Sequence, residues 1–140
     1  MHNVILCGCG GKMGRFVAEA VSNDNQLKVV AGVDKYNPGC DFPVFQNFNE
    51  IDIKADVIID FSNPALIDDL LEYAIKNNIA VVIATTGYNE DQTAKIKSAA
   101  EKIPVFFTFN MSLGVNLLLR LVQEAAKVLA ANGIKVRIYD

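Results

Sequence analysis

Histidine, cysteine and long apolar runs are scarce in this 140-residue chain. The one histidine, His2, lies beside the N-terminus, where we expect it to be solvated. The three cysteines, Cys7, Cys9 and Cys40, are odd in number and lack the paired spacing of a metal site. We therefore expect no metal, and we interpret Cys7 and Cys9 as a small core residue beside a turn residue.

No apolar stretch approaches the roughly 20 residues that a helix needs to cross a bilayer, and the N-terminus shows no signal peptide. The formal net charge is −3 without a basic cluster, so we expect no nucleic-acid partner. The chain also shows no internal repeat, low-complexity segment or linker. Since 51% of the residues are hydrophobic, we expect one cytoplasmic domain over residues 1–140 with a sizeable core and no membrane partner.

A glycine-rich turn, Gly8-Cys9-Gly10-Gly11-Lys12-Met13-Gly14, is the most informative feature that is present. It follows the apolar run of residues 4–7 and precedes an expected helix at residues 15–21. A strand that ends in glycines and restarts as a helix points free backbone N–H groups at one place, which favours a bound phosphate. The match to the GxGxxG pattern is imperfect, because Met13 stands at the third glycine position.

An acidic residue follows the next expected strand at the distance that a dinucleotide site requires. Residues 27–33 form that strand, and Asp34 lies 20 positions after Gly14, where an acceptor for a ribose 2′-hydroxyl is expected. The strand, turn, helix, strand and acid together favour a nucleotide-binding βαβ unit. The alternative is an ordinary βαβ turn with a solvated aspartate.

The rest of the chain alternates short apolar runs with amphipathic stretches, apart from an irregular crossover with little helix at residues 36–54. Further strands are expected at residues 55–61, 80–84, 105–109 and 134–139, and helices after residue 63, after residue 89 and over residues 113–131. This alternation predicts an α/β fold, a doubly wound parallel sheet of the Rossmann type. A ligand then lies at the carboxyl ends of the strands, where Ser62, Asn63 and Asn110 are either site residues or helix caps.

Four motifs give the chain a specific resemblance to dihydrodipicolinate reductase, also called 4-hydroxy-tetrahydrodipicolinate reductase. They stand in the order and spacing of that family over nearly the whole chain: residues 8–14, Asp60-Phe61-Ser62-Asn63-Pro64, Thr85-Thr86-Gly87-Tyr88 and Asn110-Met111-Ser112-Leu113-Gly114-Val115-Asn116. The resemblance implies an enzyme that uses NADH or NADPH to reduce a cyclic dicarboxylate in the diaminopimelate route to lysine.

The resemblance also implies which residues hold the cofactor. Residues 8–13 would bind the pyrophosphate, and residues 84–86 and 108–111 would line the nicotinamide side, with Thr86 also facing the substrate. Ala84 stands where the family usually has glycine. The expected cofactor-binding residues are Gly8, Cys9, Gly10, Gly11, Lys12, Met13, Asp34, Lys35, Ala84, Thr85, Thr86, Thr108, Phe109, Asn110 and Met111.

Asp34 and Lys35 would meet the adenosine ribose of the cofactor. A carboxylate accepts a hydrogen bond from a 2′-hydroxyl, whereas an ammonium group pairs with a 2′-phosphate. We therefore expect both NADH and NADPH to bind, with a preference for NADH.

In the family, a second domain carries a His-His…Lys stretch and a Ser-Gly-Thr turn that bind the substrate carboxylates and supply the proton. The sequence ends at Asp140 without these motifs, so we expect that substrate domain to be absent, no catalytic residue in this chain, and cofactor binding with negligible turnover. The family forms homotetramers mainly through that domain, so a monomer is an open alternative for this chain. Two alternatives remain: another Rossmann reductase of the aspartate or homoserine dehydrogenase type, or a non-catalytic dinucleotide sensor.

Overall fold

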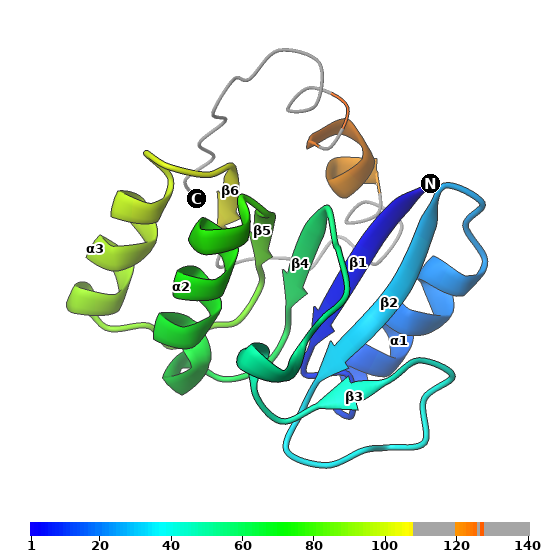
Figure 1. Cartoon of the computed structure of the whole chain (residues 1–140). Coiled ribbons are helices and arrows are strands. Elements are labelled where there is room, and N and C mark those ends of the chain that lie inside the picture. The colour runs from blue at the N-terminus through cyan, green and yellow to red at the C-terminus, as the bar shows by residue number, and fades with distance from the viewer. Residues whose placement is uncertain (108–119, 126, 128–140) are drawn as a thin grey trace.

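The structure, a computed structural model, describes residues 1–107, 120–125 and 127 (Figure 1). Its strands are β1 (His2–Cys7), β2 (Leu27–Val33), β3 (Val44–Phe45), β4 (Val57–Asp60), β5 (Ala80–Ile83) and β6 (Val105–Phe107). Its helices are α1 (Lys12–Ser22), α2 (Ile67–Asn77) and α3 (Glu90–Ala99), with short 3-10 helices η1 (Phe48–Glu50) and η2 (Pro64–Leu66). Residues 120–125 and 127 are also helical.

The six strands form one sheet in the order β3-β2-β1-β4-β5-β6, and every pairing between neighbours is parallel. This is the strand order of a dinucleotide-binding Rossmann sheet, so the predicted fold class is confirmed. The direction of winding reverses between β1 and β4. Ligands of such sheets lie outside the carboxyl ends of the strands at this switch point.

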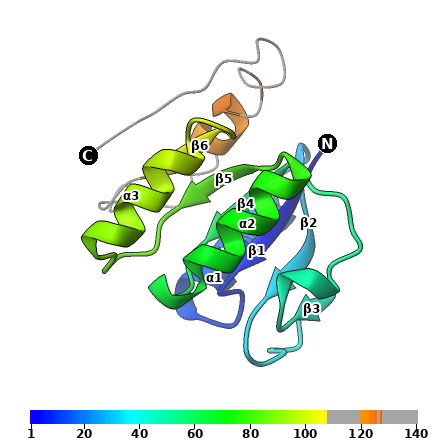
Figure 2. The ribbon, with the colours of Figure 1, turned by 60° about the vertical axis from the view of Figure 1, so that its left-hand side comes forward.

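Helices cover both faces of the sheet, with α1 on one face and α2 and α3 on the other (Figures 1 and 2). Successive side chains of a strand point to opposite faces. In β1, Val4 and Leu6 pack in the cluster that includes Val17 of α1, whereas Ile5 packs with Leu70 of α2. This two-sided burial explains why β1 reads as a continuous apolar run rather than as an alternating one.

Two expected elements differ from the structure. The crossover at residues 36–54 has little helix, as expected, since it holds only the three-residue η1, but it also contains the strand β3, because Val44 and Phe45 pair with the end of β2. Helix α1 begins at Lys12 rather than at residue 15, because Gly11 already takes the N-cap position. The strand expected at 134–139 and most of the helix expected at 113–131 lie outside the described residues. Within the described part of the chain, no helix is long and apolar enough to cross a membrane.

Candidate functional site

The glycine turn leaves β1 at the switch point of the sheet and passes directly against the end of β4. Gly8 has a φ of +76°, a conformation that costs other residues energy, and its N–H bonds the Val33 carbonyl at 2.8 Å. A Cβ atom on Gly8 would lie 2.8 Å from the carbonyl carbon of Phe61 and 3.0 Å from the Cα of Ser62. Only glycine therefore permits this close passage between β1 and β4.

Gly14 lets the first turn of α1 pack directly on the glycine turn. A Cβ atom on Gly14 would collide with the carbonyl oxygen of Gly8 and lie 2.8 Å from the Cα of Cys9. Both contacts are with backbone, which cannot move aside. Gly14 therefore provides the close helix packing that the third glycine of a GxGxxG turn provides, although Met13 occupies that motif position.

The N-terminus of α1 presents backbone N–H groups, and no acidic side chain of the first turn lies there to offset the positive end of the helix dipole. The first hydrogen bond of the helix runs from the N–H of Arg15 to the carbonyl of Gly11 at 3.1 Å. The N–H groups of residues 12–14 come before this bond and have no acceptor within the helix. The first turn of α1 carries no acidic residue, whereas α2 and α3 each have two acidic residues there. With the exposed Lys12, this end of α1 favours a bound anion.

The carboxylate of Asp34 lies beside the glycine turn at the end of β2. The N–H of Gly10 donates to its Oδ2 at 2.8 Å, and the N–H of Tyr36 lies 3.5 Å from its Oδ1. Asp34 is half-buried, while Lys35 and Tyr36 are exposed. The structure thus brings the turn and the acid together, as the spacing in the sequence predicted.

Asp60, which ends β4, is a functional candidate that the sequence reasoning did not single out. Its side chain is 1% exposed and accepts hydrogen bonds from the hydroxyls of Thr85 at 2.8 Å and Tyr88 at 3.1 Å. The Ser62 hydroxyl also donates to it. A carboxylate at the end of a continuous apolar run was the available signal, because charged groups are rarely buried without hydrogen-bonding partners.

The predicted residues after β5 face in different directions. Thr85 is 6% exposed and turns its hydroxyl inward to Asp60, so the proton of this hydroxyl is not available to a ligand. Thr86 is exposed on the rim, and Ala84 is half-buried.

The sequence left open whether Ser62, Asn63 and Asn110 are helix caps or site residues. Asn63 is a cap, because its side chain accepts a hydrogen bond from the N–H of Ala65 at 2.9 Å. Ser62 bonds Asp60 instead, through its N–H at 3.1 Å and its hydroxyl. Asn110 and the other predicted site residues at 108–111 lie outside the described residues. Across the described ranges, no group of three or more His, Cys, Asp or Glu side chains could hold a metal ion.

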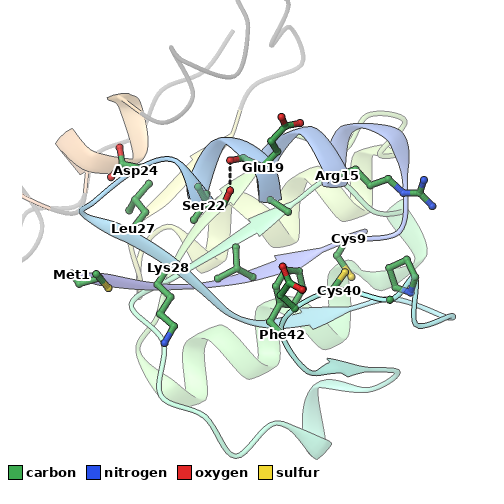
Figure 3. A pocket seen from close by; sticks show the side chains of 16 residues that line it. Met1, Cys9, Arg15, Glu19, Ser22, Asp24, Leu27, Lys28, Cys40 and Phe42 are labelled. Carbon is green, nitrogen blue, oxygen red and sulfur yellow. Dashed lines mark hydrogen bonds between the residues drawn. The ribbon is translucent and has the colours of Figure 1, made fainter.

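A cavity of about 790 Å³ lies beside α1, over the segment that connects β2 to β3 (Figure 3). Among the expected cofactor-binding residues that the structure describes, the cavity contacts Cys9 alone, so it lies mostly away from the rim described above. The side chain of Cys9 is fully buried and packs so closely on Gly32 that a Cβ there would lie 2.7 Å from its Sγ. Burial, and then the neighbouring Cys40, raise the pKa of Cys9 to about 12.

The chain is similar to one protein family over most of its length. A family model described as "Dihydrodipicolinate reductase, N-terminus" matches residues 2–111. The 4-hydroxy-tetrahydrodipicolinate reductase of Clostridium novyi (strain NT) is 42% identical over 133 residues, which are 94% of this chain and 53% of the relative. The enzyme of the same name from Caldanaerobacter subterraneus subsp. tengcongensis is 46% identical over 136 residues, 97% of this chain and 54% of the relative. The chain thus spans about half the length of these relatives.

Solved structures share the fold. A dipicolinate-bound dihydrodipicolinate reductase from Paenisporosarcina sp. TG-14 superposes with a TM-score of 0.72 at 27% identity, over 90% of this chain and 54% of the other. A homoserine dehydrogenase from S. aureus has a TM-score of 0.58 at 20% identity, over 74% of this chain and 31% of the other. The second likeness shows only a common fold, so it does not favour a homoserine dehydrogenase.

Proposed function

The chain belongs to the dihydrodipicolinate reductase family, and from this premise we propose that it binds NADH or NADPH along the carboxyl edge of its sheet. It would serve as the cofactor-binding part of an enzyme that reduces 4-hydroxy-tetrahydrodipicolinate to tetrahydrodipicolinate in lysine biosynthesis. One observation carries the proposal. The turn at Gly8 crosses the switch point and leads into a helix whose first N–H groups face no acidic residue of their own turn.

A cofactor pyrophosphate fits this turn. The close contacts at Gly8 and Gly14 hold the turn tightly against the end of β4 and the start of α1, which fixes the turn at the place where the diphosphate would approach. The N–H groups at the start of α1 and the ammonium of Lys12 would bind its oxygens. When bound, the reduced nicotinamide supplies the hydride, and the residues of this chain hold the cofactor.

Asp34 and Lys35 would recognise the adenosine ribose. The bond from Gly10 holds the Asp34 carboxylate next to the turn, where it can accept from a 2′-hydroxyl. Lys35 is exposed on the same connection and can pair with a 2′-phosphate. The chain would therefore use both cofactors, with NADH preferred.

The nicotinamide side would lie along Ala84, Thr85 and Thr86, and Thr86 would also face the substrate, because it is exposed on the rim. The assignment of residues 108–111 to this side stays a prediction. Since the named relatives are about twice as long as this chain, the 140 residues alone are expected to bind cofactor with negligible turnover. Robust reductase activity from these residues would contradict that expectation.

Fluorescence titration tests the proposal. The chain contains no tryptophan, so the emission of the reduced nicotinamide itself reports binding. We expect saturable binding of NADH and NADPH, with NADH bound more tightly. A hundredfold preference for NADPH would reject the assignment of Asp34.

Asp34→Asn makes the test specific to the ribose. The amide keeps an acceptor for the N–H of Gly10 and removes the charge that repels a 2′-phosphate, so the Kd ratio should shift about tenfold toward NADPH. Asp41→Asn is the matched control, because it removes an exposed carboxylate from the same β2–β3 connection and should leave the ratio unchanged. Equal shifts in both variants would mean that only net charge matters.

A further inference from the structure

The buried carboxylate of Asp60 links the two loops that follow β4 and β5. Its Oδ1 accepts from the N–H of Ser62 at 3.1 Å and from the Ser62 hydroxyl. Its Oδ2 accepts from the hydroxyls of Thr85 at 2.8 Å and Tyr88 at 3.1 Å. One side chain therefore ties both loops to the end of a central strand.

Burying a carboxylate in this way costs free energy, so stability alone does not explain the arrangement. A carboxylate that is 1% exposed loses its hydration, and an apolar side chain of similar volume often serves a core as well or better. Asp60 takes no part in the ion pairs of Lys95 with Asp68 and of Lys127 with Glu124, and no buried side-chain polar atom of the described residues lacks a partner. A fully satisfied polar network of this kind fixes a unique geometry.

The direction of these bonds is defined. The N–H of Ser62 can only donate. Burial, and then the charge of Asp60, raise the pKa of Tyr88 far above its usual value, so its phenol keeps the proton and donates. The ring of Tyr88 also meets Phe107 of β6 edge-on, with centroids 5.7 Å apart. Tyr88 is thus held at its ring and at its hydroxyl.

The loop after β5 is consequently held on both sides of Thr86. The N–H of Ala84 bonds the Asp60 carbonyl at 3.0 Å, and Thr85 and Tyr88 reach the Asp60 carboxylate. Between them lie the exposed Thr86 and Gly87, whose φ is +91°. Because two side chains of the loop turn inward, Thr86 is left on the rim.

We infer that Asp60 is a positioning residue for the nicotinamide half of the cofactor, acting through the loop of residues 84–88. The inference rests on the proposed function, because it concerns where that loop meets a bound dinucleotide. The inference assigns the two halves of the cofactor to different residues. The glycine turn and Asp34 would hold the adenosine diphosphate half, and the hydrogen bond that joins them does not involve the Asp60 carboxylate.

Calorimetric titration with NADH and with ADP, which lacks the nicotinamide and its ribose, tests the inference. In Asp60→Asn, an NH₂ group replaces one acceptor oxygen, so we expect NADH to bind about tenfold more weakly while the Kd for ADP stays within about twofold. Tyr88→Phe removes one donor and keeps the ring against Phe107, and it should weaken NADH binding about threefold with ADP again unaffected. This second variant keeps the test decisive if Asp60→Asn does not fold.

Asn89→Ala is the matched control. It removes the cap of α3 next to the same loop without touching Asp60, so it should lower the Tm and leave the ratio of the two Kd values unchanged. An unchanged ratio in Asp60→Asn and Tyr88→Phe, or equal weakening of NADH and ADP, would overturn the inference. If the unmodified protein bound neither ligand, the proposed function itself would be wrong.

Discussion

The thiol of Cys9 shows how one buried residue makes stability depend on pH. Its pKa in the folded protein is about 12, compared with an ordinary value of 9.0. Above pH 9 the unfolded chain loses this proton while the folded chain keeps it. The free energy of unfolding should therefore fall between about pH 9 and 12, by up to about 1.4 kcal/mol per pH unit from this thiol.

Urea unfolding at pH 8, 9 and 10 measures this dependence. Cys9→Ala should give a shallower decline with pH than the unmodified protein. Val17→Ala, which truncates an equally buried side chain in the same cluster, should lower stability by a similar amount at every pH. Identical slopes in all three proteins would show that Cys9 does not contribute.

At the scale of an element, the end of α2 depends on one asparagine. Asn78 has a φ of +53° and a ψ of +49° and caps the helix through its backbone, after which Ile79 is buried. The left-handed conformation costs a residue with a Cβ about 1–2 kcal/mol, and asparagine tolerates it better than alanine does.

Asn78→Ala should therefore lower the free energy of unfolding by about 1 kcal/mol, while Asn78→Gly should match or exceed the unmodified protein. Thermal or urea unfolding measures both. Asn77→Ala serves as the control, because Asn77 is exposed and helical, and should cost at most about 0.5 kcal/mol. If Asn77→Ala and Asn78→Ala cost the same, the backbone conformation is not the cause.

At the scale of the whole molecule, the sheet should open from β3 inward. β1 pairs with β2 over six residues and with β4 over four, whereas β3 pairs only two residues with β2. Strands with many buried contacts exchange their amide hydrogens only on global unfolding, and short outer strands exchange by local opening.

Native-state hydrogen exchange followed by NMR should find the slowest amides in β1 and β4. The amides of Val44 and Phe45 should exchange at least about 100-fold faster than those. Ile5 and Ile58, both fully buried, are suitable reporters of the centre. Uniform protection across the sheet would contradict this order.

The sequence alone determined the class of fold and predicted where the proposed anion site lies. Apolar runs of four to seven residues, separated by amphipathic segments, are typical of strands buried under helices on both faces of a parallel sheet. The spacing from Gly14 to Asp34 was sufficient to place the acid near the turn, because both follow neighbouring parallel strands. These are local patterns, so they can be read directly from the chain.

Only the tertiary structure decided which contacts form between segments that lie far apart in the sequence. The pairing of Val44 with Gly32 made β3 a strand, although its two residues carry too little pattern to predict one. Gly14 replaced the motif's third glycine because a Cβ atom at this position would meet the backbone of Gly8 and Cys9. Asp60 acquired partners 25 and 28 residues away, which turned an acid at the end of an apolar strand into the link between two loops. Such contacts depend on which strands become neighbours, and burial then selects among the side chains that meet there.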